Sequence, residues 1–126
     1  MHTKLSEREV RDALYDFELI PLNKFIKYYF DNPSVWTLFK KYSEAALFAG
    51  RKRYSHVTIM ELIRWNCEIE QGDAEFKVNN NNKALYARLL MRTDPRFNKF
   101  FEIRECKITK SATNFNYNKK GQASFL

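Results

Sequence analysis

The sequence contains few of the residues that tight turns require, with three glycines and three prolines among 126 positions. An all-β chain needs such residues at short intervals, so an all-β fold is disfavoured. Apolar residues make up 44% of the chain and aromatic residues 16%. This aromatic content is too high for a disordered protein, and the length suits a single domain with one packed core.

Cysteine and histidine are also scarce, with two of each: Cys67, Cys106, His2 and His56. No C-x-x-C spacing joins the cysteines, so we expect buried thiols and no disulfide. His56 has no nucleophile or second ligand nearby in the sequence. We therefore expect no metal site and no cofactor.

Catalytic motifs are missing as well, including any glycine-rich phosphate loop. Glu75 and Lys77 match the acid-x-lysine element of one class of metal-dependent nucleases. That class also uses an aspartate on a neighbouring strand well upstream, and Asp73 is too close to serve. We expect a protein that is not an enzyme.

Long apolar runs are absent, and the first ten residues, MHTKLSEREV, have no apolar signal-peptide segment. A membrane-spanning helix needs about 20 consecutive apolar residues. We therefore expect a soluble, cytoplasmic protein with no membrane partner.

The charge is strongly positive. Lys and Arg number 22 against 15 Asp and Glu, which gives a net charge of +7 and a pI near 9.5. By our count of the printed sequence, residues 1–31 carry −1, residues 32–66 carry +4 and residues 67–126 carry +4. A basic body behind a neutral leading segment suggests an anionic partner, although many small proteins of high pI have none.

Apolar residues at helical spacing predict helices over 6–17, 22–30, 34–50 and 56–66. Ser6 and Glu9 form a capping box, and Pro21 is expected to break the first helix. Pro33 marks the start of the third helix and Gly50 its end. The expected inward residues of the third and fourth helices are Val35, Leu38, Phe39, Tyr42 and Ala46, then Ile59, Met60, Ile63 and Cys67.

The remaining segments are predicted from shorter patterns. Alternating residues predict a short strand or an extended lead-in at 75–78 and a strand at 100–108. A helix is predicted from the asparagine repeat, Asn79 to Asn82, to about Arg92. From Thr109 the chain is polar and basic, which is typical of a flexible tail.

This order of elements resembles a winged helix-turn-helix domain. The resemblance implies a mainly α (α+β) fold over residues 32–108, with three helices and short β-strands. An N-terminal helical extension (1–31) would precede it and a flexible basic tail (109–126) would follow. In such domains the third helix enters the major groove and a β-hairpin forms the wing.

A second resemblance is carried by NPSVWTLF, IRW, FKVNNN, YAR and FFEIR, between Asn32 and Arg104. These segments are similar to a family of small proteins of phages and prophages. The resemblance implies a mobile-element origin, and hence the cytoplasm of a bacterial host cell. It transfers no catalytic residues.

The helix after the asparagine repeat is the first candidate site. If Leu85 or Tyr86 faces inward with Leu89 and Leu90, then Asn81, Ala84, Arg88 and Arg92 lie on one outer face. Lys83 lies one position off that line, and Asn80 is a further candidate for nucleic-acid contact. Asparagine amides pair with adenine, and arginine matches guanine or phosphate. The alternative is that the asparagines only cap the helix and that the arginines form a solvated face.

Two further basic segments are candidates for phosphate contact: Arg51, Lys52 and Arg53 between two helices, and Arg104 with Lys107 on the expected wing. Each alternative is an ordinary solvated surface. Trp36 falls outside the apolar stripe of its helix and is a weaker candidate for base stacking.

We therefore expect a nucleic-acid-binding protein, with duplex DNA as the favoured ligand, acting as a small regulator or accessory protein of a phage or mobile element. The alternative is a protein-binding module, such as a phage-encoded inhibitor of a host defence (for example an anti-CRISPR) or of a polymerase complex. Its basic surface would then contact an acidic host protein or a nucleoprotein complex. The N-terminal helices either cap the core or pair two protomers as a homodimer.

Overall fold

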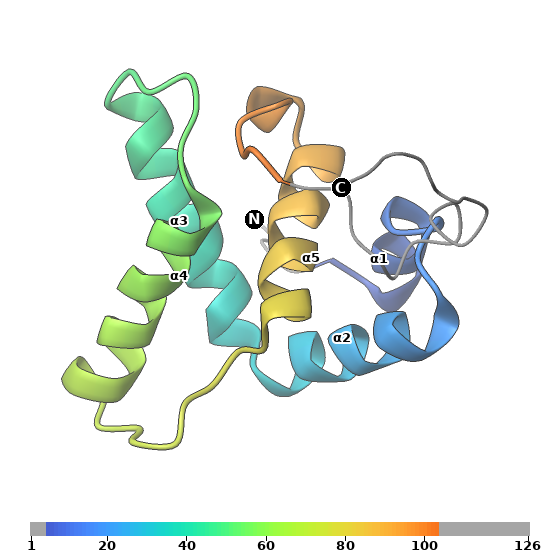
Figure 1. Cartoon of the computed structure of the whole chain (residues 1–126), viewed down its shortest axis with the longest axis horizontal. Coiled ribbons are helices and arrows are strands. Elements are labelled where there is room, and N and C mark those ends of the chain that lie inside the picture. The colour runs from blue at the N-terminus through green and yellow to red at the C-terminus, as the bar shows by residue number, and fades with distance from the viewer. Residues whose placement is uncertain (1–4, 104–126) are drawn as a thin grey trace, which may run out of the picture.

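A computed structural model describes residues 5–103 of the chain, and this part is built from helices (Figure 1). The α-helices are α1 (Glu7–Ala13), α2 (Leu19–Asp31), α3 (Pro33–Phe48), α4 (His56–Trp65) and α5 (Asn80–Thr93). A π-helix, η1 (Asn66–Glu70), extends α4, and a 3-10 helix, η2 (Pro95–Phe97), follows α5. Residues 5–103 contain no β-strand, so the mainly α prediction holds and the winged-helix prediction is wrong.

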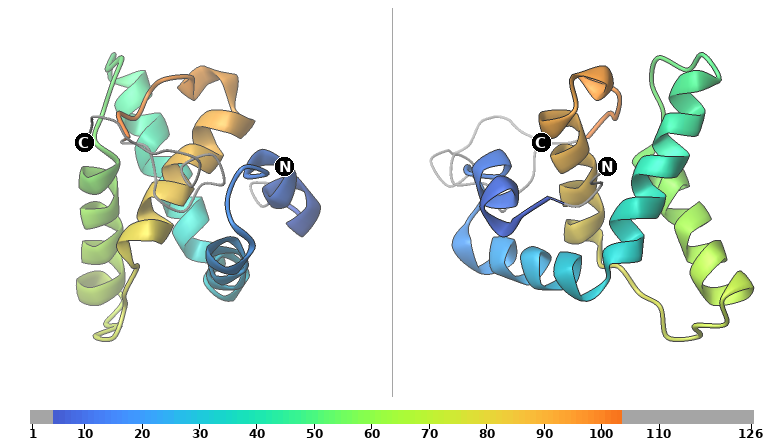
Figure 2. Two further views of the ribbon diagram at one scale, coloured as in Figure 1. Left: turned by 45° about the vertical axis from the view of Figure 1, so that its right-hand side comes forward. Right: turned by 180° about the vertical axis from the view of Figure 1, so that it is seen from behind.

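Helix α5 lies at the centre of the molecule. It packs against α3 and α4 on one side and against α1 and α2 on the other (Figures 1 and 2). Its apolar residues cover more than one face, which is typical of a buried helix. The fully buried ones are Leu85, Tyr86, Ala87, Leu89 and Leu90. A recognition helix instead leaves one face open to the major groove, so the central position of α5 also differs from that of the third helix in a winged-helix domain.

The N-terminal helices belong to the same core. The predicted capping box is present, since Ser6 Oγ accepts the N–H of Glu9 and the Glu9 carboxylate accepts the N–H of Ser6. Val10, Leu14 and Phe17 are buried in one cluster with residues of α3 and α5. This burial favours the capping alternative for residues 1–31.

Pro21 was expected to break the first helix, but it lies inside the next one. The first helix ends at Ala13, and Pro21 lies in the first turn of α2. The N–H groups of a first helical turn have no partner within the helix, so a residue without one fits there.

An aromatic cluster joins α2, α3 and α5 around Tyr86. Phe25 meets the Tyr86 ring edge-on at 4.8 Å between centroids, and Trp36 stacks on it at 6.3 Å. Trp36 is therefore a core residue, and burial excludes it as a stacking platform. The buried stripe of α3 runs through Val35, Trp36, Phe39 and Ser43 rather than through Leu38 and Tyr42, which are half-buried.

Helix α4 buries the residues that its sequence predicted, Ile59, Met60, Ile63 and, in η1, Cys67. Cys67 is a buried free thiol, as expected, whereas Cys106 lies outside the described residues.

Both predicted strands are absent where the structure describes them. Glu75 lies in a turn and residues 76–78 have no partner strand, and Phe76 and Val78 pack against the core. In the segment 100–103 only an isolated parallel bridge between Tyr54 and Phe101 forms. The alternating patterns therefore reflect alternate side chains that pack against the helical core without a sheet. Residues 104–108 of the second strand and the predicted tail lie outside the described residues.

Candidate nucleic-acid interface

The asparagine repeat starts α5 as a helix cap. The Asn79 side chain accepts the N–H of Asn82 at 2.7 Å, and the Asn82 side chain is buried. Asn80 and Asn81 are exposed in the first turn. Capping accounts for Asn79, and Asn80 and Asn81 stay accessible to a ligand.

The arginines of α5 do not share an open face with these asparagines. Arg92 forms a two-pronged ion pair with Asp16 at 2.7 and 3.2 Å and donates to the Ala13 carbonyl at 2.9 Å. The hydrogen bond from Arg92 lowers the pKa of Asp16 below its usual value, against a smaller opposing effect of burial. Arg88 is half-buried and stacks on Phe17 with Arg92, at 5.6 and 5.5 Å from the ring centroid. These two arginines hold the α1–α2 connection to α5.

Lys83 lies apart from Arg88 and Arg92, on the side of α5 that faces α4. It lines a hollow of about 420 Å³ between α4 and the segment 74–79, together with Arg64 and Glu68. Burial is the main cause that lowers the pKa of His56, and the positive charge of Lys83 lowers this pKa further. The expected row of Asn81, Arg88 and Arg92 is therefore not a single binding surface.

The basic segment between α3 and α4 starts from a tight helix end. Gly50 adopts φ 93°, and the N–H groups of Gly50 and Arg51 donate to the Leu47 and Ala46 carbonyls at 3.0 and 3.1 Å. This is a Schellman motif, which needs a left-handed residue and so favours glycine. The chain turns sharply there, and Arg51, Lys52 and Arg53 are exposed.

A second turn brings Lys99 to the surface. Phe100 donates its N–H to the Phe97 carbonyl at 2.9 Å across Asn98 and Lys99. Asn98 has φ −56° and ψ 121°, and Lys99 has φ 61°, which fits a type II β-turn. The third position of this turn normally holds glycine, because a side chain there costs about 1 kcal/mol or more. The chain tolerates this cost and keeps an exposed ammonium group.

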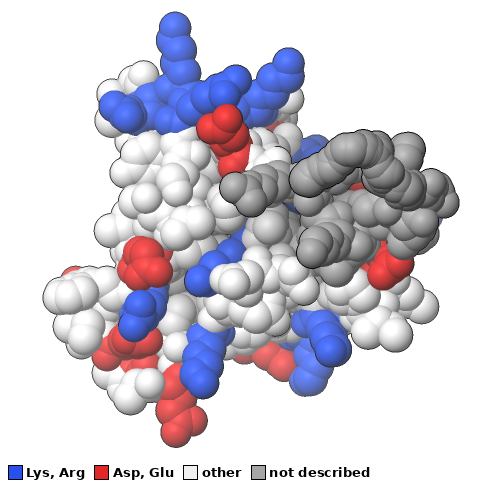
Figure 3. Space-filling view, viewed as in Figure 1, with Lys and Arg blue, Asp and Glu red and all other residues white. Residues whose placement is uncertain are grey.

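The two turns are joined by backbone. Tyr54 donates its N–H to the Phe100 carbonyl at 3.0 Å, and Tyr54 and Phe101 form the parallel bridge. Lys52 and Lys99 each precede a bridging residue by two positions, and Arg53 and Lys99 line one hollow. We call Arg51, Lys52, Arg53 and Lys99 the basic rim. Figure 3 shows Lys and Arg side chains gathered at this end of the molecule.

The charges of the basic rim are only weakly compensated. Arg53 lies 3.9 Å from Glu102, and both side chains are mostly exposed, at 66% and 87%. Such an exposed pair contributes little energy and exchanges easily for another anion. Arg51 stacks on Tyr54 at 5.9 Å. Lys52 and Lys99 make no ion pair within residues 5–103.

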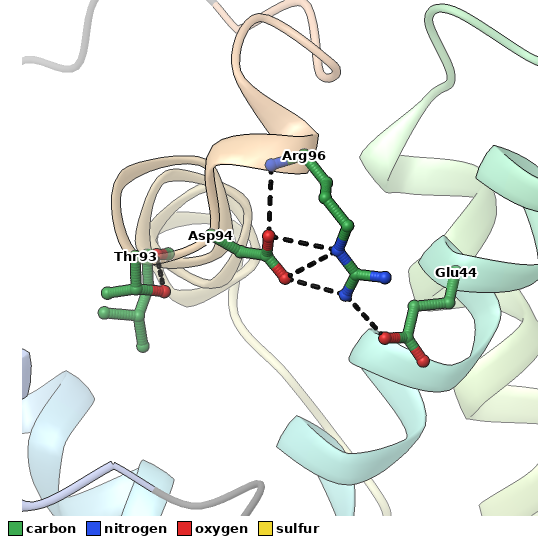
Figure 4. A network of polar contacts seen from close by, with 5 residues as sticks. Glu44, Thr93, Asp94 and Arg96 are labelled. Carbon is green, nitrogen blue, oxygen red and sulfur yellow. Dashed lines mark hydrogen bonds and ion pairs between the residues drawn. The ribbon is translucent and has the colours of Figure 1, made fainter.

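Arg96 supports the rim without belonging to it. Its guanidinium lies between two carboxylates, donating to Asp94 at 2.8 Å and to Glu44 of α3 at 2.7 Å (Figure 4). The hydrogen bond from Arg96 lowers the pKa of Asp94. This network fixes η2, and with it the turn that carries Lys99, to α3.

A shallow hollow of about 410 Å³ lies beside the rim. Arg53, Lys99 and Arg92 line it, and its other residues are Met91, Asn98, Phe101, Glu102 and Ile103. The candidate residues Arg104 and Lys107 follow directly in the sequence and lie outside the described residues. The hollow can accept an anionic group between Arg53 and Lys99.

Sequence reasoning identified Arg51, Lys52 and Arg53 but missed Lys99. Its neighbour Asn98 is a common turn residue, but the missing glycine hid the type II turn. The bridge between Tyr54 and Phe101 joins the segment of Lys99 to the segment of Lys52, and it has no local signal in the sequence.

Neither a metal site nor a membrane-spanning helix is found in the described part of the chain. Residues 5–103 contain no group of three or more His, Cys, Asp or Glu side chains arranged to hold a metal ion. None of the helices formed by these residues is long and apolar enough to cross a membrane.

Comparison of the chain with protein-family models, curated proteins and solved structures gave no match. The resemblance to phage and prophage proteins therefore stays a prediction.

Proposed function

We propose that the protein binds nucleic acid through the basic rim, by contacts to the phosphate backbone. The observation that carries this proposal is that one backbone bridge joins two segments 47 residues apart whose turns carry Lys52 and Lys99, and that Arg53 and Lys99 line one hollow. Neither lysine has an ion-pair partner among the described residues. Clusters of uncompensated cations favour a polyanion, because binding releases its condensed counterions.

Because α5 is buried, the proposal assigns no base contacts to it. Arg88 and Arg92 are held by Phe17 and Asp16, so they support the fold and not base recognition. Phosphate contacts orient a protein on nucleic acid without reading its sequence. We therefore propose binding with little sequence preference. Duplex DNA remains the expected partner, in an accessory role for a phage or mobile element.

Fluorescence anisotropy with a labelled random duplex, measured between about 50 and 200 mM salt, tests the proposal. If the rim replaces about four counterions, log affinity falls with log salt at a slope of about −3 to −4. Poly-glutamate serves as a second ligand, because an acidic-protein partner would be mimicked by carboxylates. If the protein binds poly-glutamate but no duplex, its partner is an acidic protein and not nucleic acid.

A further inference from the structure

An apolar stripe on the outer surface of α4 and η1 takes no part in the core. Leu62, Trp65 and Ile69 are 43%, 59% and 58% exposed. Their spacing of three and four residues places them on one helix face, away from Ile59 and Ile63, which are fully buried. Three large apolar side chains together on an exposed helix are more than the isolated ones that a monomer normally shows.

We propose that this stripe joins two copies of the chain, with α4 of one copy antiparallel to α4 of the other. An isologous interface of this kind uses the same surface on both copies, so the surface must complement itself. The proposal does not depend on the proposed nucleic-acid binding.

The apolar residues satisfy that condition. Leu62 and Ile69 are equally far in sequence from the point between residues 65 and 66. A two-fold axis at that point sets Leu62 against Ile69 of the second copy and brings the two Trp65 rings together. A hollow of about 320 Å³, lined by Trp65, Ile69 and three charged residues, borders the stripe and offers space for an apolar side chain of the second copy.

The charged residues beside the stripe, its charged flank, are also self-complementary when the two-fold axis lies between residues 65 and 66. This flank carries Glu61, Arg64 and Glu68, and within one copy Arg64 bonds to Glu68 at 3.2 Å. An antiparallel two-fold sets each flank against the same flank of the other copy. It then places Arg64 within one helical rise of Glu68 of the second copy, so two symmetry-related ion pairs can form across the interface.

The distribution of charge also permits this pairing. The axis lies near the C-terminal end of α4, whereas the basic rim precedes its N-terminus. The rims of the two copies therefore point away from each other and repel little. A standard interface uses about 20–30 residues from each partner, far more than this stripe and its charged flank contain, so we expect a weak, concentration-dependent dimer.

Sedimentation equilibrium over a range of protein concentrations tests the pairing. The weight-average mass should rise from 15.1 kDa toward twice that value as concentration increases. Trp65→Glu should hold the mass at the monomer value. Phe48→Glu, at an apolar residue that is 73% exposed on α3, should leave the dimer intact. A wild-type chain that stays monomeric at the highest concentrations overturns the proposal, as does equal loss in both variants.

A charge exchange tests the register. Arg64→Glu sets two carboxylates against each other across the interface, and Glu68→Arg sets two guanidinium groups against each other. Each variant alone should therefore dimerise more weakly than wild type. Mixed together, the two variants should form a heterodimer in which both ion pairs are restored. A mixture no more dimeric than the separate variants contradicts this register, even if Trp65→Glu behaves as expected.

Discussion

Tyr54 and Phe101 pair through a single parallel bridge, in which the N–H of Tyr54 donates to the Phe100 carbonyl at 3.0 Å. The bridge joins the α3–α4 connection to the segment after η2. It converts two separate basic turns into one surface with an uncompensated lysine on each.

Lys99→Gly should stabilise the fold by about 0.5–1 kcal/mol, because glycine adopts a positive φ without strain. The same change should weaken duplex binding, since it removes a rim cation. Urea unfolding and anisotropy measure the two effects, and Lys99→Ala is the control that loses the charge but keeps the strain. Lower stability of the glycine variant would show that the Lys99 conformation is not strained.

Arg96→Met should destabilise the fold by about 1 kcal/mol at neutral pH, because it leaves Asp94 and Glu44 without their shared partner. Since Arg96 lowers the pKa of folded Asp94, that carboxylate stabilises the fold above its unfolded pKa of about 4. The contribution is lost as the pH falls through the folded pKa. The wild type should therefore lose stability more steeply than Arg96→Met between about pH 5 and 3 in urea titrations. An equal loss of stability between pH 5 and 3 in the two proteins would contradict a contribution from the Arg96–Asp94 ion pair.

Tyr86→Phe should leave stability unchanged or raise it by up to about 1 kcal/mol. The Tyr86 hydroxyl is buried and has no hydrogen-bond partner within residues 5–103. Tyr29→Phe is the matched control: the Tyr29 hydroxyl accepts the N–H of Leu5 at 2.7 Å, so its loss should cost about 1 kcal/mol. A larger cost at Tyr86 than at Tyr29 would reveal a partner for the Tyr86 hydroxyl.

Phe17→Ala should destabilise the fold by about 3–5 kcal/mol, because Phe17 is buried and both Arg88 and Arg92 stack on it. Tyr15→Ala, two residues away at a side chain that is 72% exposed, should change stability by less than about 0.5 kcal/mol. Thermal unfolding compares the two. Similar small effects would mean that the α1–α2 connection is an appendage and not part of the core.

Features that depend on neighbouring residues were predictable from the sequence. The Ser6–Glu9 capping box, the stop at Gly50 and the buried face of α4 all follow from local spacing. Features that depend on distant partners were not. Asp16, the partner of Arg92, is 76 positions away, so α5 looked like an exposed basic helix although it is the central one.

The residues of the basic rim also differ in whether the local sequence predicts them. Arg51, Lys52 and Arg53 were visible as a charged run next to Gly50, whereas Lys99 joins them only through the bridge at Tyr54. The alternating residues of 75–78 and 100–103 favoured strands, because alternation indicates that one side of a segment is covered and does not identify the partner. It does not show whether a helix or another strand provides the cover.

The salt dependence of duplex binding by two double variants tests the central claim most directly. Lys52→Ala with Lys99→Ala removes both uncompensated rim cations. Lys24→Ala with Lys77→Ala removes the same charge from α2 and from the segment before α5, both far from the rim (Figure 1). The rim variant should bind more weakly and flatten the log–log salt slope by about two units, while the control keeps nearly the wild-type slope. Equal slopes for the two variants would contradict binding through the basic rim.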